Sequence, residues 1–238
     1  MAADGSRPIT AAEMRRIAED PGQLDLVGAP EGFDALVMAD IVRARKGLSV
    51  FVARDGARLS AFCDAFRFFA PEVEVLTFPA WDCLPYDRIG PSGGVAAQRM
   101  TTLSRLANGL DGQTRLLVTS APALLQRAPP QSAVKGASYS ARTGNVVEIA
   151  DLEVYFAVNG YQRASTVSEK GEFAIRGGVI DVFPPSADEP VRLDLFGDTL
   201  ESIRAFDPET QRSTRQLKDI SLLPVSEALL DKEAVSRF

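Results

Sequence analysis

Apolar runs and amphipathic segments alternate along the first half of the chain. Near-continuous apolar runs are typical of buried strands, whereas apolar residues that recur every three or four positions are typical of helices. By these patterns we predict strands at residues 24–29, 48–53, 73–78 and 115–119, and helices at residues 34–46, 55–69 and 95–107. Strands that alternate with helices predict β-α-β units, and therefore a parallel sheet that is covered on both faces.

The hydrophobic pattern changes near Ala128-Pro129-Pro130. Beyond this point we predict one helix at residues 151–159 and then short strands separated by turns. The pairs Gly177-Gly178 and Gly197-Asp198 each interrupt an alternating apolar run, as tight hairpin turns do. We expect a compact α+β unit after the first, parallel-sheet domain. A boundary near residue 128 and a softer one near residue 212 divide the chain into residues 1–128, 129–212 and 213–238.

Arg176 lies at the end of the clearest strand pattern in the chain. In the run GEFAIRGGVIDVFPP, Glu172, Ala174 and Arg176 alternate with Phe173 and Ile175. This period of two predicts a strand with Phe173 and Ile175 buried and the other three side chains in water. The strand would therefore carry the Arg176 guanidinium outward beside a glycine turn, where it can meet a partner.

The composition excludes several kinds of catalytic and metal site. The chain has 238 residues, no histidine and two cysteines, Cys63 and Cys83. Without histidine, Ser-His-Asp and Cys-His catalysis are excluded, and a four-ligand zinc site is out of reach. The carboxylates Asp181 and Asp194 could form an acid/base pair, but we expect them to be solvated or salt-bridged, with Arg192 or Arg204 as a surface partner of Asp194. We predict no catalytic residue, metal or cofactor.

The charge balance favours a protein partner over nucleic acid. The net charge is −6, and the acidic excess is concentrated in residues 129–212. Broad binding to a phosphate backbone needs clustered Lys and Arg, so we expect no strong binding of nucleic acid. No apolar run approaches the roughly 20 residues of a membrane span, and residues 1–14 lack the pattern of a signal peptide. We therefore expect no membrane association and a cytoplasmic protein.

A glycine-containing loop follows the first predicted strand, where a phosphate-binding loop lies in nucleotide-binding α/β folds. Gly28 and Gly32 supply two glycines, but Phe33 and Asp34 follow where the motif needs Lys and Ser or Thr. Glu31 and Asp34 would also place negative charge beside a phosphate. We interpret the segment as a degenerate phosphate loop that binds no nucleotide.

Several blocks of residues together resemble one bacterial protein family. In order, they are WDCLPYDRIGPSGGVAAQRMTTLSRL, YQRASTVSEKGEFAIRGGVIDVFPP, VRLDLFGDTLESIRAFDPETQRS and DISLLP. The blocks are similar to the N-terminal, UvrB-like region of the transcription-repair coupling factors. The resemblance implies a degenerate P-loop helicase-like domain at residues 1–128 with an inserted α+β domain at residues 129–212. These would correspond to UvrB-like domains 1a and 2, and residues 213–238 would return towards the first domain as the start of domain 1b.

The resemblance also implies a partner. In the family, the inserted domain recruits the excision-repair protein UvrA to stalled RNA polymerase, and the full-length protein is an ATP-dependent DNA translocase. UvrB-like sequences carry the pattern Y-x-R followed by F-R-x-R-G. Its first and last arginines match Arg163 and Arg176, and Ala174 stands in the middle position. The expected UvrA-binding residues are Arg163, Arg176 and the adjoining Phe173 and Glu172.

The leading hypothesis is therefore a non-catalytic docking module, whose full-length relatives also engage RNA polymerase and DNA. Two other readings remain open. One is a nucleotide-binding ATPase of the same α/β class, and the other is a UvrB-like module that binds damaged DNA.

Overall fold

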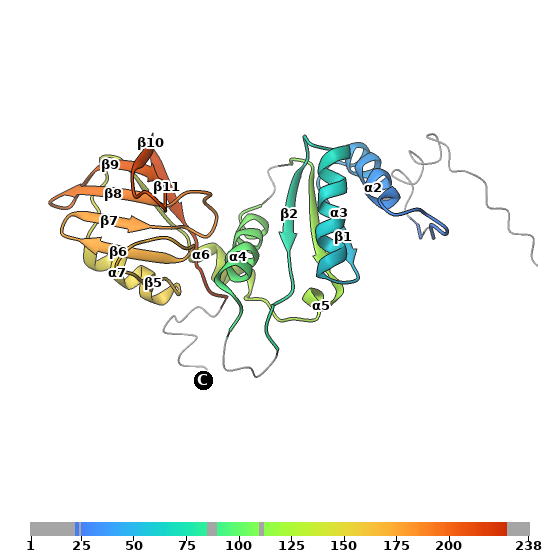
Figure 1. Ribbon diagram of the computed structural model, residues 1–238, viewed down its shortest axis with the longest axis horizontal. Coiled ribbons are helices and arrows are strands. Elements are labelled where there is room, and N and C mark those ends of the chain that lie inside the picture. The colour runs from blue at the N-terminus through green and yellow to red at the C-terminus, as the bar shows by residue number, and fades with distance from the viewer. Residues whose placement is uncertain (1–21, 24, 85–89, 110–111, 228–238) are drawn as a thin grey trace, which may run out of the picture. The chain divides into compact units, whose positions relative to one another are not determined.

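The computed structural model describes residues 22–23, 25–84, 90–109 and 112–227 (Figure 1). The chain divides into two compact units. The first unit contains the residues up to 80 together with residues 110–126, and the second contains residues 81–109 and the residues from 127 onward.

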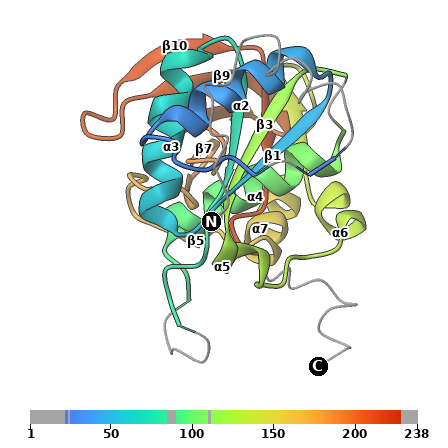
Figure 2. The same ribbon diagram turned by 90° about the vertical axis from the view of Figure 1, so that its right-hand side faces the viewer.

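A parallel sheet forms the centre of the first unit. Its three strands are β1 (Leu48–Ala53), β2 (Glu74–Phe78) and β3 (Arg115–Ser120), in the order β1-β3-β2. Among the described residues, the helices of this unit are α2 (Phe33–Ala44), α3 (Gly56–Phe69) and the short α5 (Ala121–Leu124), and Figure 2 shows α2 and α3 side by side. Parallel pairing of β3 with both neighbours confirms the predicted parallel sheet.

Helices α2 and α3 pack on one face of this sheet through a core of aromatic and small side chains. The ring of Phe51 on β1 stacks on Phe62 of α3 with centroids 3.5 Å apart, and Phe62 is fully buried. The Asp55 side chain begins α3 by accepting a hydrogen bond of 2.9 Å from the Arg58 backbone N–H. Such N-cap bonds satisfy donors that the first helical turn leaves open.

Two sequence predictions for the first unit were wrong. Residue 24 of the strand expected at residues 24–29 lies outside the described residues, and residues 25–29 form no strand. Gly28 within this run has a φ of 71°, outside the extended region. Val27 in the same run is 91% exposed. The sheet is also not covered on both faces along β1, where Leu48, Val50 and Val52 are 38–49% exposed. Because Phe51 packs on Phe62 of α3, these three alternate residues point away from the helices.

A mostly antiparallel sheet forms the centre of the second unit. Its six strands are arranged in the order β10-β9-β8-β7-β6-β5. They are β5 (Gln162–Arg163), β6 (Glu172–Arg176), β7 (Val179–Val182), β8 (Val191–Phe196), β9 (Thr199–Phe206) and β10 (Ser213–Leu217). The pairs β6–β7 and β8–β9 are hairpins, as the turns at Gly177-Gly178 and Gly197-Asp198 predicted.

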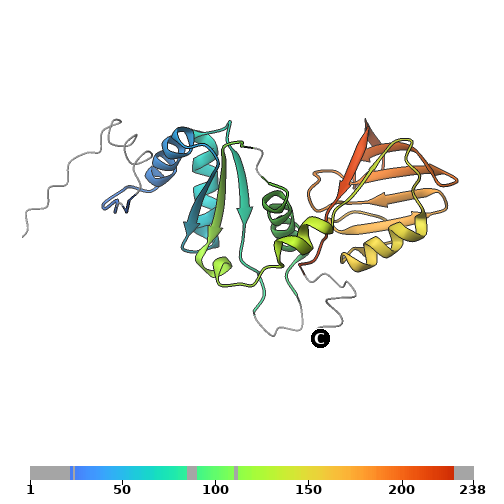
Figure 3. The same cartoon turned by 180° about the vertical axis from the view of Figure 1, so that it is seen from behind.

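Helix α7 (Ile149–Val158) packs on this six-stranded sheet (Figure 3). The Phe156 ring on α7 stacks on Phe173 of β6 with centroids 4.4 Å apart. The separate pair of β4 (Tyr139–Arg142) and β11 (Asp219–Leu222) also contributes to this core. Tyr161 joins it by donating a hydrogen bond of 2.7 Å to the Leu223 carbonyl, and burial raises the pKa of the Tyr161 hydroxyl well above its usual value.

In the part of the second unit that the structure describes, the remaining helices are α4 (Gly93–Ala107) and α6 (Gln131–Gly136). Helix α4 joins this unit although it lies before residue 128, and β10 and β11 join it although they lie after residue 212. The three-domain division expected from the sequence therefore stays a prediction. No helix among the described residues combines the length and the apolar character that crossing a membrane requires.

Candidate protein-docking site

The six-stranded sheet has one face under α7 and one face turned away from it. Because Phe173 packs on α7, its strand neighbour Ala174 belongs to the opposite face, which we call the outer face. One row across the outer face contains Ala174, Asp181, Arg192, Arg204 and Gln216. The adjoining row contains Arg176, Val179, Asp194 and Ser202. Three arginines and two aspartates therefore lie together on this face.

Asp181 is the buried centre of the first row, with its side chain 2% exposed. Arg192 donates to it in a two-pronged contact, from Nε at 2.7 Å and from Nη2 at 2.9 Å. This hydrogen bonding raises the pKa of Arg192. The Arg192 guanidinium also lies 4.8 Å from the centre of the Phe206 ring, within cation–π distance. The Asp181 carboxylate therefore acts as a hydrogen-bond acceptor that holds the Arg192 side chain in place.

Asp194 is the centre of the second row. It accepts hydrogen bonds from Arg204, from Nε at 3.1 Å and from Nη2 at 2.6 Å, and from the Ser202 hydroxyl. Both carboxylates are salt-bridged, one of the two states expected from the sequence, and Arg204 is the partner of Asp194. Both carboxylates therefore accept hydrogen bonds from guanidinium groups. We call Arg176, Asp181, Arg192, Asp194 and Arg204 together the charged cluster of the outer face.

Arg176 lies on the outer face beside Asp181, with its side chain 52% exposed. Its Nη1 is 3.6 Å from the Asp181 carboxylate, and its Nη2 donates to the Ser165 carbonyl. The predicted outward position of Arg176 is confirmed. The accompanying prediction for Ala174 was wrong, because this residue is only 3% exposed. A small cluster with Val167, Phe183 and Phe206 covers it.

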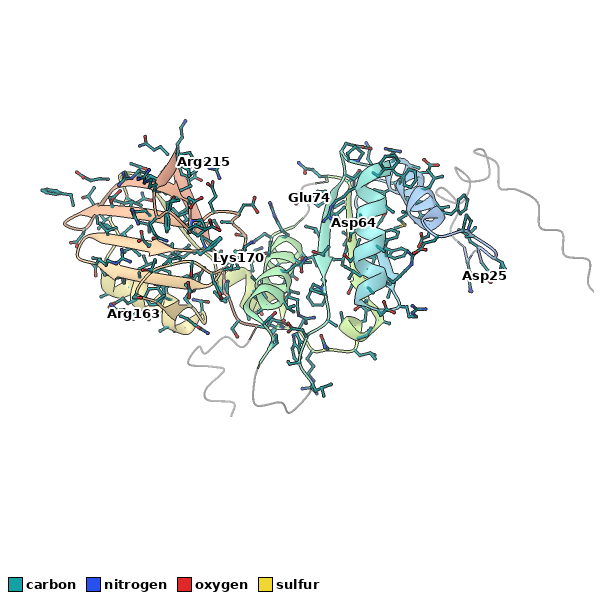
Figure 4. The ribbon with its side chains drawn as sticks, in the orientation of Figure 1. Asp25, Asp64, Glu74, Arg163, Lys170 and Arg215 are labelled. Carbon is teal, nitrogen blue, oxygen red and sulfur yellow. The ribbon has the colours of Figure 1, made fainter. Side chains whose placement is uncertain are left out.

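Arg163 lies on the other side of the sheet. The parallel register of β5 and β6 pairs Arg163 with Phe173, and paired residues point to the same face. Its Nη1 accordingly approaches Glu153 of α7 at 3.4 Å, and its side chain is 63% exposed. Figure 4 labels Arg163 at the β5 edge and Arg215 at the opposite, β10 edge of the sheet. The structure thus places Arg163 and Arg176 on strands β5 and β6 but on different faces.

Phe173 and Glu172 support the strand that carries Arg176. Phe173 is 7% exposed and belongs to the core under α7. The Glu172 carboxylate accepts hydrogen bonds from the backbone N–H groups of Ser168 and Glu169, at 2.8 and 2.9 Å. These bonds fix the loop before β6. Sequence reasoning singled out these two residues and named Arg204 only as an expected ion-pair partner of Asp194. The place of Arg204 on the same face as Arg176 follows from the pairing of strands β6 to β9.

The segment that the sequence analysis interprets as a degenerate phosphate loop lies in the first unit, before α2. Gly28 and Gly32 have φ of 71° and 83°, and no strand precedes them at residues 25–30. Asp34 at the start of α2 is occupied by an ion pair with Arg58. Across the described residues, no group of three or more Cys, Asp or Glu side chains is placed to hold a metal ion.

Comparison with known proteins agrees with the resemblance drawn from the sequence. Residues 140–227, which include the outer face, match the UvrB interaction domain family. Curated relatives named transcription-repair-coupling factor match at 36% identity in Myxococcus xanthus, over 89% of this chain and 18% of the relative. In Escherichia coli the identity is 31%, over 97% of this chain and 19% of the relative. In Bacillus subtilis the identity is 32%, over 68% of this chain and 14% of the relative.

These matches confirm that the chain resembles the UvrB-like region of the coupling factors. The chain spans about a fifth of the length of the relatives from Myxococcus xanthus and Escherichia coli.

Proposed function

We propose, on the premise of this similarity to the coupling factors over most of the chain, that the protein is a docking module that recruits UvrA in nucleotide excision repair. The module itself carries out no chemistry. It supplies a binding face, and a protein of the relatives' length would bring that face to stalled RNA polymerase on DNA by ATP-dependent translocation. Its place of action would be the cytoplasm.

One observation carries this proposal, and it concerns Arg176. Within the residues that match the UvrB interaction domain family, Arg176 extends a half-exposed guanidinium from a rigid sheet, next to a carboxylate that another arginine already occupies. A planar guanidinium fixed in this way is suited to grip a carboxylate of a partner, because its N–H donors form a fork that matches two oxygens.

The chemistry of the outer face supports a protein partner. Two guanidiniums, those of Arg176 and Arg204, are 52% and 42% exposed, whereas the carboxylates of Asp181 and Asp194 are 2% and 24% exposed. The positive groups are therefore nearer the solvent than the negative ones. The patch is small and lies on an acidic chain, so a few partner carboxylates fit it better than a long phosphate backbone does.

Arg163 is proposed as a second contact at the β5 edge. Its long side chain is exposed and lies on the strand next to β6, so a partner that covers Arg176 and wraps over this edge would meet both. A contact of this kind is expected to contribute less than Arg176, because Arg163 points to the α7 side.

A binding measurement with purified UvrA tests the proposal. We expect saturable binding by isothermal titration and a loss of about tenfold or more in the Arg176→Ala variant, as is common for interface arginines. Arg215→Ala is the matched control, because Arg215 is 62% exposed and forms one ion pair, with Glu189 at 3.0 Å, at the far edge of the same sheet. The proposal fails if the wild-type chain does not bind UvrA.

Titrations of the same purified chain test the two other candidate functions, an ATPase and a DNA-binding module. Saturable heat on titration with ATP and magnesium would support an ATPase. Binding to damaged duplex DNA that weakens steeply with salt would support a DNA-binding module.

A further inference from the structure

Two exposed apolar side chains lie together at one end of the outer face. Phe196, the last residue of β8, is 76% exposed, and Val146 is 73% exposed. Thr199 lies between them, because it pairs with Phe196 across the β8–β9 hairpin and with Val146 through a β-bridge on its other side. Side chains that are paired across strands point to the same face, so Phe196, Thr199 and Val146 form one row.

The register identifies that face as the outer one. The preceding pair, Leu195 and Leu200, packs with the core under α7. The next pair along, Phe196 and Thr199, must therefore point away from α7. Val147, the neighbour of Val146, is 2% exposed and lies in the same core, which turns Val146 outward as well.

The backbone around this apolar pair is firmly held. The Val147 N–H donates to the Asp198 carbonyl at 2.7 Å, and the Leu200 N–H donates to the Asn145 carbonyl at 3.0 Å. On the other side, the Leu195 N–H donates to the Gly178 carbonyl at 2.7 Å. A partner would find Phe196 and Val146 already in place, so ordering them on binding costs little conformational entropy.

The exposed apolar pair, Phe196 and Val146, lies next to the charged cluster on the outer face. Phe196 is two residues from Asp194 on the same face of β8, and Asp194 shares its row with Val179 and Arg176. Neighbouring strands are about 4.8 Å apart, so the two strand spacings between Asp194 and Arg176 amount to roughly 10 Å. An aromatic side chain and two exposed arginines, Arg176 and Arg204, thus fall within the width of one protein contact.

We propose that Phe196, with Val146, is the apolar anchor of the docking face whose charged part is Arg176 and Arg204. This inference rests on the proposed function and specifies the surface of the partner. The occupant is a protein surface that places an apolar side chain on Phe196 and carboxylates on the neighbouring guanidiniums.

The charges on the face favour this occupant. Three guanidiniums face two carboxylates, and both carboxylates lie beneath guanidiniums that remain partly exposed. An approaching carboxylate therefore meets positive charge first. Aromatic and arginine side chains are also the residue types most enriched at the centres of protein interfaces, and here they occur side by side.

Binding of purified UvrA by substituted chains tests the anchor, with matched controls from the same protein. We expect Phe196→Ser to weaken binding about tenfold and Val146→Ser several-fold, as for residues at the centre of an interface. Phe68→Ser and Val154→Ser are the controls. Phe68 on α3 is 80% exposed in the first unit, and Val154 is 61% exposed on α7. We expect both controls to bind as the wild type does.

These titrations test the apolar anchor separately from the docking function. If Arg176→Ala loses affinity while Phe196→Ser binds as the wild type does, the docking function stands and the apolar anchor is overturned. If the wild-type chain fails to bind UvrA at all, the proposed function itself is overturned together with the anchor.

A second copy of the chain is another possible occupant of the apolar surface. Sedimentation of the wild-type chain and of Phe196→Ser tests for it. A wild-type dimer that becomes a monomer on this substitution would assign the apolar pair to a second copy of the chain and overturn the proposal. Equal melting temperatures are expected for the wild type and Phe196→Ser, because an exposed side chain contributes little to the fold.

Discussion

The guanidinium of Arg99 donates hydrogen bonds to both carboxylate oxygens of Glu227, 128 residues later in the chain. The Arg99 side chain is fully buried and that of Glu227 is 11% exposed. Trp81 completes the cluster, with its Nε1 3.0 Å from a Glu227 oxygen and its ring centre 5.4 Å from the guanidinium. Three distant segments of the second unit therefore meet at one buried ion pair.

Removal of one member of this pair should destabilise the second unit strongly. We expect Glu227→Gln to lower the free energy of unfolding by about 3–5 kcal/mol, because the buried Arg99 guanidinium loses the charged carboxylate that accepts two of its hydrogen bonds. Urea unfolding followed by tryptophan fluorescence measures this, since Trp81 is the only tryptophan of the chain. Arg142→Ala is the control, because the Arg142–Asp219 pair is 3.8 Å apart and mostly exposed. Equal losses in the two variants would contradict the expectation.

The two arginines matched by the family pattern should contribute unequally to UvrA binding. Arg176→Ala is expected to weaken binding about tenfold or more, and Arg163→Ala only a few-fold, because the two side chains lie on different faces. Titration calorimetry of the single and double variants measures the difference. Wild-type affinity in the double variant would place the docking surface elsewhere.

Magnesium and ATP should leave the melting temperature unchanged. A ligand stabilises a protein only when it binds the folded state. Here residues 25–30 form no strand, and Asp34 brings negative charge. Thermal denaturation with and without millimolar MgATP is the measurement. A rise in melting temperature that requires magnesium would refute the interpretation of a degenerate loop.

Gly178→Ala should destabilise the second unit. A Cβ at this position would lie 2.6 Å from the carbonyl oxygen of Leu195, so one of the two strands would have to shift. We expect a lower melting temperature. Gly94→Ala is the matched control, because nothing lies within 4 Å of its added Cβ and alanine favours the helix. An unchanged melting temperature in Gly178→Ala would show that β7 and β8 can move apart.

The two thiols should react at different rates. Cys63 is buried on α3, and burial raises the pKa of its thiol, so little thiolate forms near pH 8. Cys83 is partly exposed. With a chromogenic disulfide reagent, we expect one thiol per chain to react quickly in the native protein and both to react in denaturant. Two fast thiols in the native protein would indicate that the core around Cys63 opens readily.

Local pattern was enough to find most elements. The alternation in residues 172–176 and the glycine pair after it predicted the β6–β7 hairpin, and the apolar periods predicted α3, α4 and α7 closely. The strand prediction for residues 24–29 was wrong, because the apolar residues of this run resemble those of a buried strand although Val27 is 91% exposed. A short apolar run forms a strand only where a sheet offers it an edge and a covering layer.

The sequence by itself determined the kinds of elements, the hairpins and the outward position of Arg176, because each depends on residues that are close together in the chain. Only the tertiary structure decided that Arg163 lies on the α7 side, that Arg204 and Phe196 join Arg176 on the outer face, and that Arg99 meets Glu227. The first two depend on strand register, which a shift of one residue would reverse. The last depends on a contact between residues far apart, which no local pattern records.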